Sequence, residues 1–403
     1  MSMRYSARVW AAAICLLACV VFVLLQGGKV SSLLLFSVCV LFLYVILGRF
    51  SGVRSAYGER TLSGIGHEAV SAGTRIGVNL DVSVPGLWPI PYLTVRDRLI
   101  RQDGEEWLFE NAAATDWNRS AHVSYFTPPL RRGRYRFAES QVAVSDVFGL
   151  FSHEGILRSE QSFSVLPQTV HIKDWRRLDQ AVRGQLQHTA ATQAVRETTQ
   201  INGVREYIYG DKLSRIHWNA TAKTGTWKSK EFEREARPKT VLVLDRSAGS
   251  YPDEETFELA VSVAASIIDY GSQKDLSVGM VSSGSQSAVF EPRQSKGIHR
   301  TLTDHLISVE ADGSHLLGTV LKERLSREFR GCFVVLITPV QSQKLLESMQ
   351  WLEQRQMIPC HIHIGQDTFS KESWHRMLKR SGYTGYSIRR LDELPSALGG
   401  GSA

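Results

Sequence analysis

The side chains best suited to chemistry lie between Asn202 and Glu235, where acidic, basic and imidazole groups alternate with two tryptophans. Asp211 and His217 could act as a carboxylate and a general base, the pair that activates a nucleophile or a water. They are six positions apart, however, so a helix would present them on different faces. The sequence has no Gly-x-Ser-x-Gly elbow, no His-Glu-x-x-His pair and no phosphate-binding glycine loop. We therefore expect no enzymatic activity; the alternative is a hydrolase or transferase using Asp211, His217 and the crevice near Asp245.

The same stretch also has a structural interpretation. "GDKLSRIHW" predicts a helix with Asp211 as its N-cap and Arg215, four residues later, as an ion-pair partner. Leu213 and Ile216 are expected to face inward, and Gly225 is expected to end the helix. The following "TWKSKEFERE" predicts an extended segment.

Local pairing could account for much of the remaining charge. Arg205 could pair with Glu206 or Glu233, and Lys223 with the carbonyl end of the helix. Trp218 and Trp227 lie near arginines, a composition favoured at interaction hot spots, although tryptophan is equally common in cores. A docking surface and a self-contained ion-pair network both remain open.

Strands alternating with helices follow from Lys239 onward. The apolar runs "TVLVLD", "LSVGMVSS", "CFVVLITP" and "IPCHIHIG" predict buried strands, and amphipathic segments separate them. This pattern predicts a doubly wound α/β domain, whose ligand crevice lies beyond the carboxyl ends of the central strands.

The beginning of the chain contains two uncharged apolar runs, 9–25 and 30–47, separated by "QGGK". Each approaches the length that a spanning helix needs, so we expect a transmembrane hairpin in the cell membrane. A signal peptide is the alternative for the first run. The flanking basic residues are Arg4, Arg8, Arg49, Arg54 and Arg60, against Lys29 alone in the turn. The positive-inside rule then places the N-terminus and the main C-terminal portion in the cytoplasm.

Between these regions the sequence alternates with turn signals such as "PGLWPIP" and "RRGRY", as in a small β-sandwich. The chain is basic, with a net charge of +7 and a pI near 9.1, which suits a membrane surface. Its basic residues are mixed with acids and no nucleic-acid-binding motif is present, so we expect no nucleic acid partner.

The expected organisation is multidomain. It comprises a transmembrane helical hairpin at 1–48, a connector at 49–66, a small all-β, sandwich-like domain at 67–167, a helical connector at 168–202, the charged segment at 203–235, the α/β doubly wound domain at 236–395 and a flexible tail at 396–403.

"REYIYGDKLSRIHWNATAKTG", followed by "KEFERE" and an apolar strand ending in Asp, resembles the signature of the bacterial domain of unknown function 58 family. "RRGRY" and "SDVFGLF" also resemble that family, although Val147 replaces its usual proline. The matching positions, which we expect to form a docking surface together with Glu233, are Arg205, Glu206, Tyr207, Gly210, Asp211, Arg215, Ile216, Trp218, Ala222 and Lys223.

The resemblance implies a membrane hairpin, a β-rich segment and a von Willebrand factor A-like domain. It also implies two protein partners, a MoxR-type AAA+ ATPase and a transglutaminase-like membrane protein. From it we expect a membrane-anchored, non-catalytic interaction or scaffold protein that works with such an ATPase in envelope-related protein assembly.

Domains of the von Willebrand factor A type bind Mg²⁺ through carboxylate and hydroxyl oxygens on three loops. Here Asp245 and Ser247 occupy the first loop and Ser314 the second, but Gly249 replaces the second serine. Thr338 stands where the third loop is expected to supply an acidic ligand. One carboxylate with a few hydroxyls is a degenerate magnesium site, so we expect no cofactor.

Overall fold

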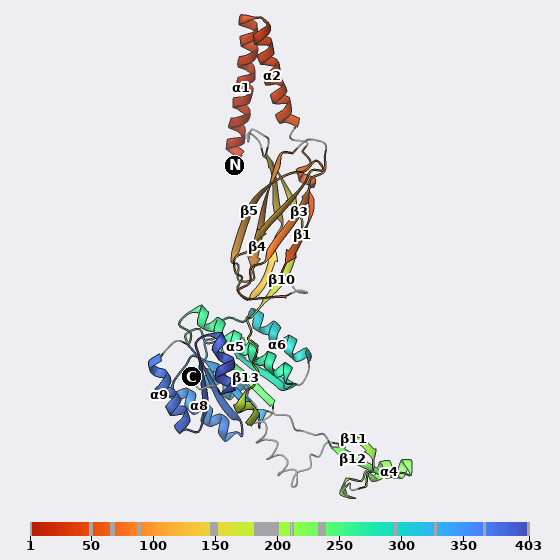
Figure 1. Cartoon of the computed structure of the whole chain (residues 1–403), viewed down its shortest axis with the longest axis vertical. Helices are drawn as coiled ribbons and strands as arrows, with labels where there is room; N and C mark the ends of the chain where they lie inside the picture. Colours follow the sequence, from red (N-terminus) through yellow and green to blue (C-terminus); the bar gives the residue numbers. More distant parts are fainter. Residues whose placement is uncertain are drawn as a thin grey trace. The chain divides into compact units, whose positions relative to one another are not determined.

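A computed structural model describes residues 2–47, 51–64, 69–86, 90–145, 152–180, 201–209, 211, 213–232, 239–293, 296–325, 329–365 and 368–400 (Figure 1). The chain divides into two compact units, Met1–Leu166 and Pro167–Ala403. It is multidomain, with an N-terminal helix pair, a β-rich region and a mixed α/β sheet.

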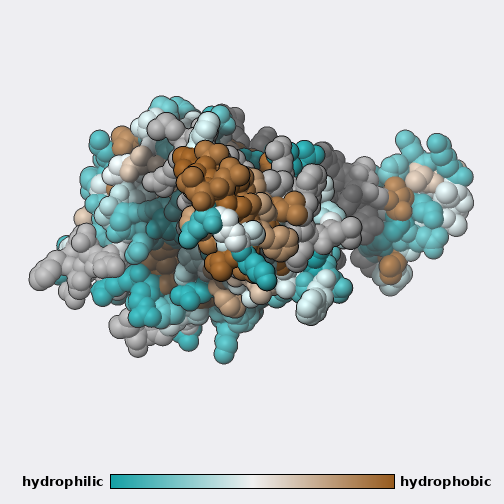
Figure 2. Space-filling view, turned by 90° about the horizontal axis from the view of Figure 1, so that it is seen from above, coloured by the Kyte–Doolittle hydropathy of each residue, from teal (hydrophilic) through white to brown (hydrophobic). Residues whose placement is uncertain are grey.

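Two helices, α1 (Ser2–Gln26) and α2 (Lys29–Leu47), begin the first unit. Gly27 and Gly28 join them with positive φ angles, a conformation that glycine adopts without steric cost. Many apolar side chains of the pair are exposed, including Leu25, Val30 and Phe36. Figure 2 shows this apolar surface in the middle of the view.

Within the described part of the chain, no helix combines the length and the apolar character that crossing a membrane requires.

The β-rich region contains two sheets. One has the order β1-β3-β6, and the other β2-β10-β7-β4-β8-β9 with β5 paired to β4. The strands are β1 (Tyr57–Ser63), β2 (Ala69–Ser71), β3 (Gly77–Ser83), β4 (Tyr92–Arg101), β5 (Glu106–Ala114), β6 (Ser120–Phe126), β7 (Gly133–Phe137), β8 (Ser140–Ser145), β9 (Ser152–Leu157) and β10 (Gln161–Leu166), and a short helix η2 (Val53–Ser55) precedes them. The core between the sheets takes Leu80 and Val123 from the first sheet and Leu93 and Val142 from the second.

Residues 57–63 correct the expected connector at 49–66, because they form strand β1. The strand carries a charged residue on its inner face, so its sequence "YGERTLS" lacks apolar alternation. Arg60 is buried and pairs with Asp97 of β4, with Nη2 2.8 Å from Oδ1. Strand β5 was not predicted either, since it alternates half-buried with exposed side chains and has no fully buried face.

The second unit is built on a sheet with the order β15-β14-β13-β16-β17-β18. All neighbours are parallel except β15, an antiparallel edge strand that the sequence pattern did not predict. The strands are β13 (Lys239–Asp245), β14 (Ser277–Ser283), β15 (Ala288–Arg293), β16 (Phe333–Thr338), β17 (Ile358–Ile364) and β18 (Thr384–Ile388).

Helices cover both faces of this sheet. One core contains side chains of α5 (Glu254–Gln273), α6 (Lys296–Ser308) and α10 (Leu394–Gly399), together with Trp175. The other contains side chains of α7 (Leu317–Arg324), α8 (Gln343–Gln354) and α9 (Thr368–Arg380). Because α10 buries Leu394 and Leu398, the flexible tail expected from residue 396 is wrong for residues 396–399.

Candidate functional site

The charged segment folds as a small module, shown at the lower right of Figure 1. Strand β11 (Ile201–Glu206) pairs antiparallel with β12 (Lys228–Phe232), and η3 (Leu213–Arg215) and α4 (Trp218–Thr224) lie between them in sequence. The predicted N-cap was wrong, because α4 begins at Trp218 and its N-cap is His217, whose Nδ1 accepts from Ala220 N at 3.1 Å. Gly225 ends the helix in the left-handed region, as predicted.

Asp211 instead stabilises the turn between β11 and η3 through side-chain hydrogen bonds. Its Oδ1 lies 2.7 Å from Arg205 Nη2, and its Oδ2 accepts from Ile208 N at 3.2 Å. The hydrogen bonds from Arg205 and then Ile208 hold the pKa of the Asp211 carboxyl below its usual range. Lys228 Nζ lies 3.1 Å from Glu206 Oε1 across the two strands. These charged groups therefore pair within the module.

The aromatic and apolar side chains of the module are largely exposed. Ile216 is buried as predicted, at 1% exposure, but Leu213 is 63% exposed, because η3 is too short to present an inward helical face. Trp218 and Trp227 are exposed, so neither belongs to a core. The rings of Trp227 and Tyr207 pack in a T-shaped arrangement, with ring centroids 5.4 Å apart.

The remaining docking candidates divide between described and undescribed residues. Arg215 is half-buried at the end of η3, and Ala222 and Lys223 are exposed on α4. Gly210 and Glu233 lie outside the described residues, as does Val147. His217 and Asp211, the candidates for acid–base chemistry, are each engaged in shaping the backbone.

A second constellation lies at the carboxyl end of β13. Asp245 is 1% exposed, and its Oδ1 accepts from Ser247 N at 3.0 Å. Its Oδ1 also lies 2.7 Å from Ser247 Oγ, and Thr338 Oγ1 donates to its Oδ2 at 2.7 Å. The Tyr251 hydroxyl donates to the Asp245 carbonyl. Burial, and then the charge of Asp245, raise the pKa of Tyr251. Asp245 thus joins the ends of β13 and β16.

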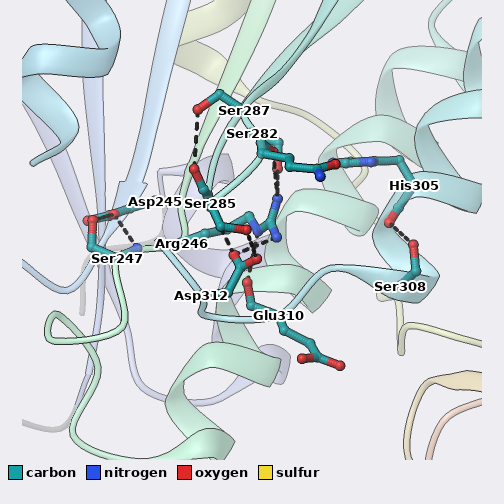
Figure 3. Close-up of polar contacts among 12 residues, drawn as sticks. Asp245, Arg246, Ser247, Ser282, Ser285, Ser287, His305, Ser308, Glu310 and Asp312 are labelled. Atoms are coloured by element: carbon teal, nitrogen blue, oxygen red, sulfur yellow. Dashed lines mark hydrogen bonds and ion pairs between the residues drawn. The ribbon is translucent and has the colours of Figure 1, made fainter. Parts of the chain in front are cut away.

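Arg246 points to the other side of the same loop (Figure 3). Its Nη2 lies 2.6 Å from Asp312 Oδ1, and its Nε donates to the Glu310 carbonyl at 2.8 Å. Burial raises the pKa of Asp312, but the Ser285 hydroxyl and Arg246 outweigh it and leave that pKa lowered. Gly284 leaves room for the guanidinium, since a Cβ there would lie 2.4 Å from Arg246 Cζ. The sequence pattern did not predict this ion pair.

A series of hydrogen bonds connects α9 and β17 to Thr338, the residue that donates to Asp245. His361 is fully buried on β17; its Nδ1 accepts from Trp374 Nε1 at 3.0 Å, and its Nε2 lies 3.3 Å from the Thr338 carbonyl. Burial, and then His363, lower the pKa of His361 to about 3. A neutral imidazole protonated on Nε2 satisfies both contacts, which fixes the position of Thr338 against Asp245.

Asp245 and Ser247 line a cavity of about 290 Å³ at the carboxyl edge of the sheet. Other lining residues come from two helices, Thr319 and Lys322 from α7 and Ser342 and Lys344 from the start of α8. Leu316, Leu317, Val340 and Leu345 give it apolar surface.

The loop that carries Ser314 contacts the first metal-loop candidate, since Ser247 Oγ lies 3.0 Å from the His315 carbonyl oxygen. Ser314 is exposed and is not among the described residues that line the cavity with Asp245 and Ser247. Among the described residues, no group of three or more His, Cys, Asp or Glu side chains could hold a metal ion.

Comparisons with known proteins give relatives of unknown function. The family described as "Protein of unknown function DUF58" matches residues 203–364. A Bacillus subtilis (strain 168) protein called "Uncharacterized protein YeaD" is 25% identical over 318 residues, covering 76% of this chain and 75% of that protein.

Two solved structures share weak likeness with parts of the chain. An aerotolerance-related membrane protein from Bacteroides fragilis is 10% identical, with a TM-score of 0.31 over 40% of this chain and 96% of that one. Proximal thread matrix protein 1 from the mussel byssus is 14% identical, with a TM-score of 0.29 over 40% of this chain. This chain spans 45% of the length of the mussel chain.

Proposed function

We propose that this chain is a membrane-anchored, non-catalytic interaction protein of the domain of unknown function 58 family, and that its von Willebrand factor A-like domain binds an acidic segment of a partner protein without a metal. The cavity lined by Asp245, Lys322 and Lys344 is the docking site. The family match over residues 203–364 and the similarity to YeaD support the assignment to this family.

The observation that carries the proposal is the charge arrangement at the cavity. Asp245 is buried, and both of its carboxylate oxygens already accept hydrogen bonds, Oδ1 from Ser247 N and Oδ2 from Thr338 Oγ1. Lys322 of α7 and Lys344 of α8 are exposed residues of the cavity lining, which also includes one exposed carboxylate, Glu347. Two ammonium groups flanking an apolar-lined cavity suit a carboxylate side chain on an extended or helical peptide.

The membrane part of the proposal places α1 and α2 in a bilayer. Their exposed apolar side chains, such as Leu25, Val30 and Phe36, favour contact with lipid over contact with water. The N-terminus and the main C-terminal portion lie in the cytoplasm in this proposal. A MoxR-type AAA+ ATPase and a transglutaminase-like membrane protein are the partners that the family resemblance supports.

The absence of turnover is also a proposal. Asp211 and His217 are occupied in fastening the turn and capping α4, which supports a structural role for both. Arg246, the cation next to Asp245, is directed to Asp312, away from the bond network of Asp245.

Crosslinking and mass spectrometry on native membranes test this function. The full chain is compared with the double variant Lys322→Glu and Lys344→Glu, and with Lys379→Glu, an exposed lysine on α9 outside the cavity. We expect a specific partner protein to crosslink at α7 or α8 in the wild type and in the control, and to be lost in the double variant. Adding EDTA should leave the crosslink unchanged.

An unchanged set of crosslinked proteins in the double variant would contradict the cavity as the docking site. The double variant Arg205→Ala and Asp211→Ala tests the other docking hypothesis, in which the partner binds the charged segment at 203–235. Loss of a partner in that variant alone would place binding on the β11–β12 module. Loss of the crosslink with EDTA would contradict the metal-free mode of binding.

A further inference from the structure

Three exposed aromatic side chains lie at one end of the β-rich region. Tyr57 begins β1 and is paired with Ser83, which in turn is paired with Ser120 at the start of β6. Tyr92 begins β4 and is paired with the end of β5. Trp117 lies in the turn that joins β5 to β6, so strand register brings all three aromatic residues to the same end.

The turn that carries Trp117 has a defined shape. Asp116 Oδ1 accepts from Ser120 N at 2.7 Å, and the Asp116 carbonyl accepts from Arg119 N at 2.9 Å. Arg119 takes a positive φ of 61°, a conformation uncommon for a residue with a Cβ. Trp117 is nevertheless fully exposed, at 103%. An indole held in water by an ordered turn buries none of its apolar surface within the described part of the chain.

This end is also where the chain enters from the helix pair. The Arg119 guanidinium donates to the Ser51 carbonyl, and Gly86 leaves space for it, because a Cβ there would lie 2.7 Å from Nη1. Ser51 follows Leu47, the last residue of α2, by four positions. Four residues span at most about 14 Å, so the Trp117 turn is tied to a point close to the end of α2.

We propose that this end of the β-rich region rests in the headgroup layer of a lipid bilayer, with Trp117, Tyr57 and Tyr92 as interfacial anchors. The inference rests on the proposed insertion of α1 and α2. Tryptophan and tyrosine favour this layer because each ring has an apolar body and a polar N–H or O–H group. The headgroup layer thus satisfies the indole N–H and removes the apolar part of the ring from water.

The opposite end of the same sheet provides a matched control. Phe126 ends β6 and is 73% exposed, so it is also a solvent-facing aromatic residue. Six residue steps along β6 separate Ser120 from Phe126, which is about 20 Å. A bilayer that contacts Trp117 therefore leaves Phe126 in water.

Depth-dependent fluorescence quenching tests the proposal. Cys15 and Cys39, the exposed cysteines, are replaced by serine, whereas Cys19, Cys332 and Cys360 are buried and are kept. Single cysteines are then introduced in the full chain as Trp117→Cys, Phe126→Cys or Phe36→Cys, and each is labelled with a nitrobenzoxadiazole dye. The proteins are reconstituted in phosphatidylcholine–phosphatidylglycerol vesicles with a nitroxide on the lipid headgroup or on the acyl chain.

We expect loss of fluorescence at position 117 with the headgroup nitroxide and unchanged fluorescence at position 126. Acyl-chain quenching at position 36, on α2, reports insertion of the helix pair. Quenching at 36 but not at 117 would overturn the interfacial role of this end and leave the membrane anchor intact. Equal quenching at 117 and 126 would also overturn it, and absence of quenching at 36 would overturn the anchor and this inference together.

Discussion

Removing Asp97 should destabilise the β-rich region more than any surface substitution. Both partners of its ion pair are buried, with side-chain exposures of 0% for Arg60 and 1% for Asp97. Arg60 Nε also donates to Asp97 Oδ2 at 3.2 Å, and its Cζ lies 4.2 Å from the centroid of the Phe137 ring. Truncating Asp97 to alanine leaves this guanidinium charged, buried and without its carboxylate.

The expected cost follows from that orphaned charge. Breaking a buried ion pair on one side costs about 3–5 kcal/mol. Ser140 and Tyr125 also lose their acceptor, because both hydroxyls donate to Asp97. Each unsatisfied buried hydroxyl costs about 1–3 kcal/mol, although these contributions overlap with the first. We expect the free energy of unfolding of the β-rich region to fall by about 4 kcal/mol in Asp97→Ala.

Hydrogen exchange followed by mass spectrometry resolves this region within the full chain, where a single unfolding transition is not expected. A loss of about 4 kcal/mol corresponds to amide exchange about a thousandfold faster in β4 and β8. The control is Glu110→Ala, which breaks the surface pair Arg96–Glu110, with side-chain exposures of 36% and 51% and an expected cost below about 1 kcal/mol.

A further variant separates the orphaned charge from lost packing. The double substitution Arg60→Met and Asp97→Leu removes both charges, and apolar replacement of a buried pair is often neutral or stabilising. We expect exchange in this double variant to be much slower than in Asp97→Ala. If Asp97→Ala behaved like Glu110→Ala, Arg60 would not depend on its carboxylate and the reasoning would be refuted.

Three further predictions concern the second unit. Gly284→Ala should cost about 1–3 kcal/mol, because its Cβ would collide with Arg246, whereas Gly249→Ala, whose Cβ meets no atom within 4 Å, should be neutral; thermal melting compares them. The free energy of unfolding of the second unit should fall by about 1.4 kcal/mol per pH unit from about pH 6.5 toward pH 3. The reason is that His361 binds a proton in the unfolded chain, whereas the folded form, in which its pKa is about 3, excludes that proton. Denaturant unfolding at pH 7 and pH 5 should show a smaller change in the free energy of unfolding in His361→Gln than in the wild type. An equal change would contradict the assignment of this pH dependence to His361. Asp211→Ala should speed amide exchange at Ile208 and alter Trp227 fluorescence, while Lys223→Ala should change neither.

Apolar patterning predicted much of the second unit because its strands are buried on both faces. The run "TVLVLD" is buried throughout, and so is "FVVLIT". Such strands need no partner to be recognised in the sequence. Strand β15 was missed because it is an edge strand with half of its side chains exposed, and its sequence "AVFEPR" contains a proline that marks strand edges.

Polar side chains that face inward or pair across a turn explain most of the other elements and contacts that the sequence did not predict. Arg60 occupies a core position that alternation assigns to an apolar residue, so β1 was interpreted as connector. In the charged segment, Asp211 and Arg205 are adjacent in space through a turn, whereas helical spacing favoured Asp211 with Arg215. Ion pairs across a turn or between strands depend on register, which residue types alone do not specify.

The two candidate sites use charge in opposite ways, and this bears on where a partner binds. In the β11–β12 module, Arg205 and Lys228 are paired with Asp211 and Glu206, while Leu213, Trp218 and Trp227 are exposed. At the α/β cavity, Asp245 is hydrogen-bonded to hydroxyl and amide donors and Arg246 is paired with Asp312, while Lys322 and Lys344 are exposed residues of the lining. Salt screens exposed charges but has little effect on apolar contact. A partner docked at the cavity should therefore dissociate as salt rises, whereas one docked on the module should not.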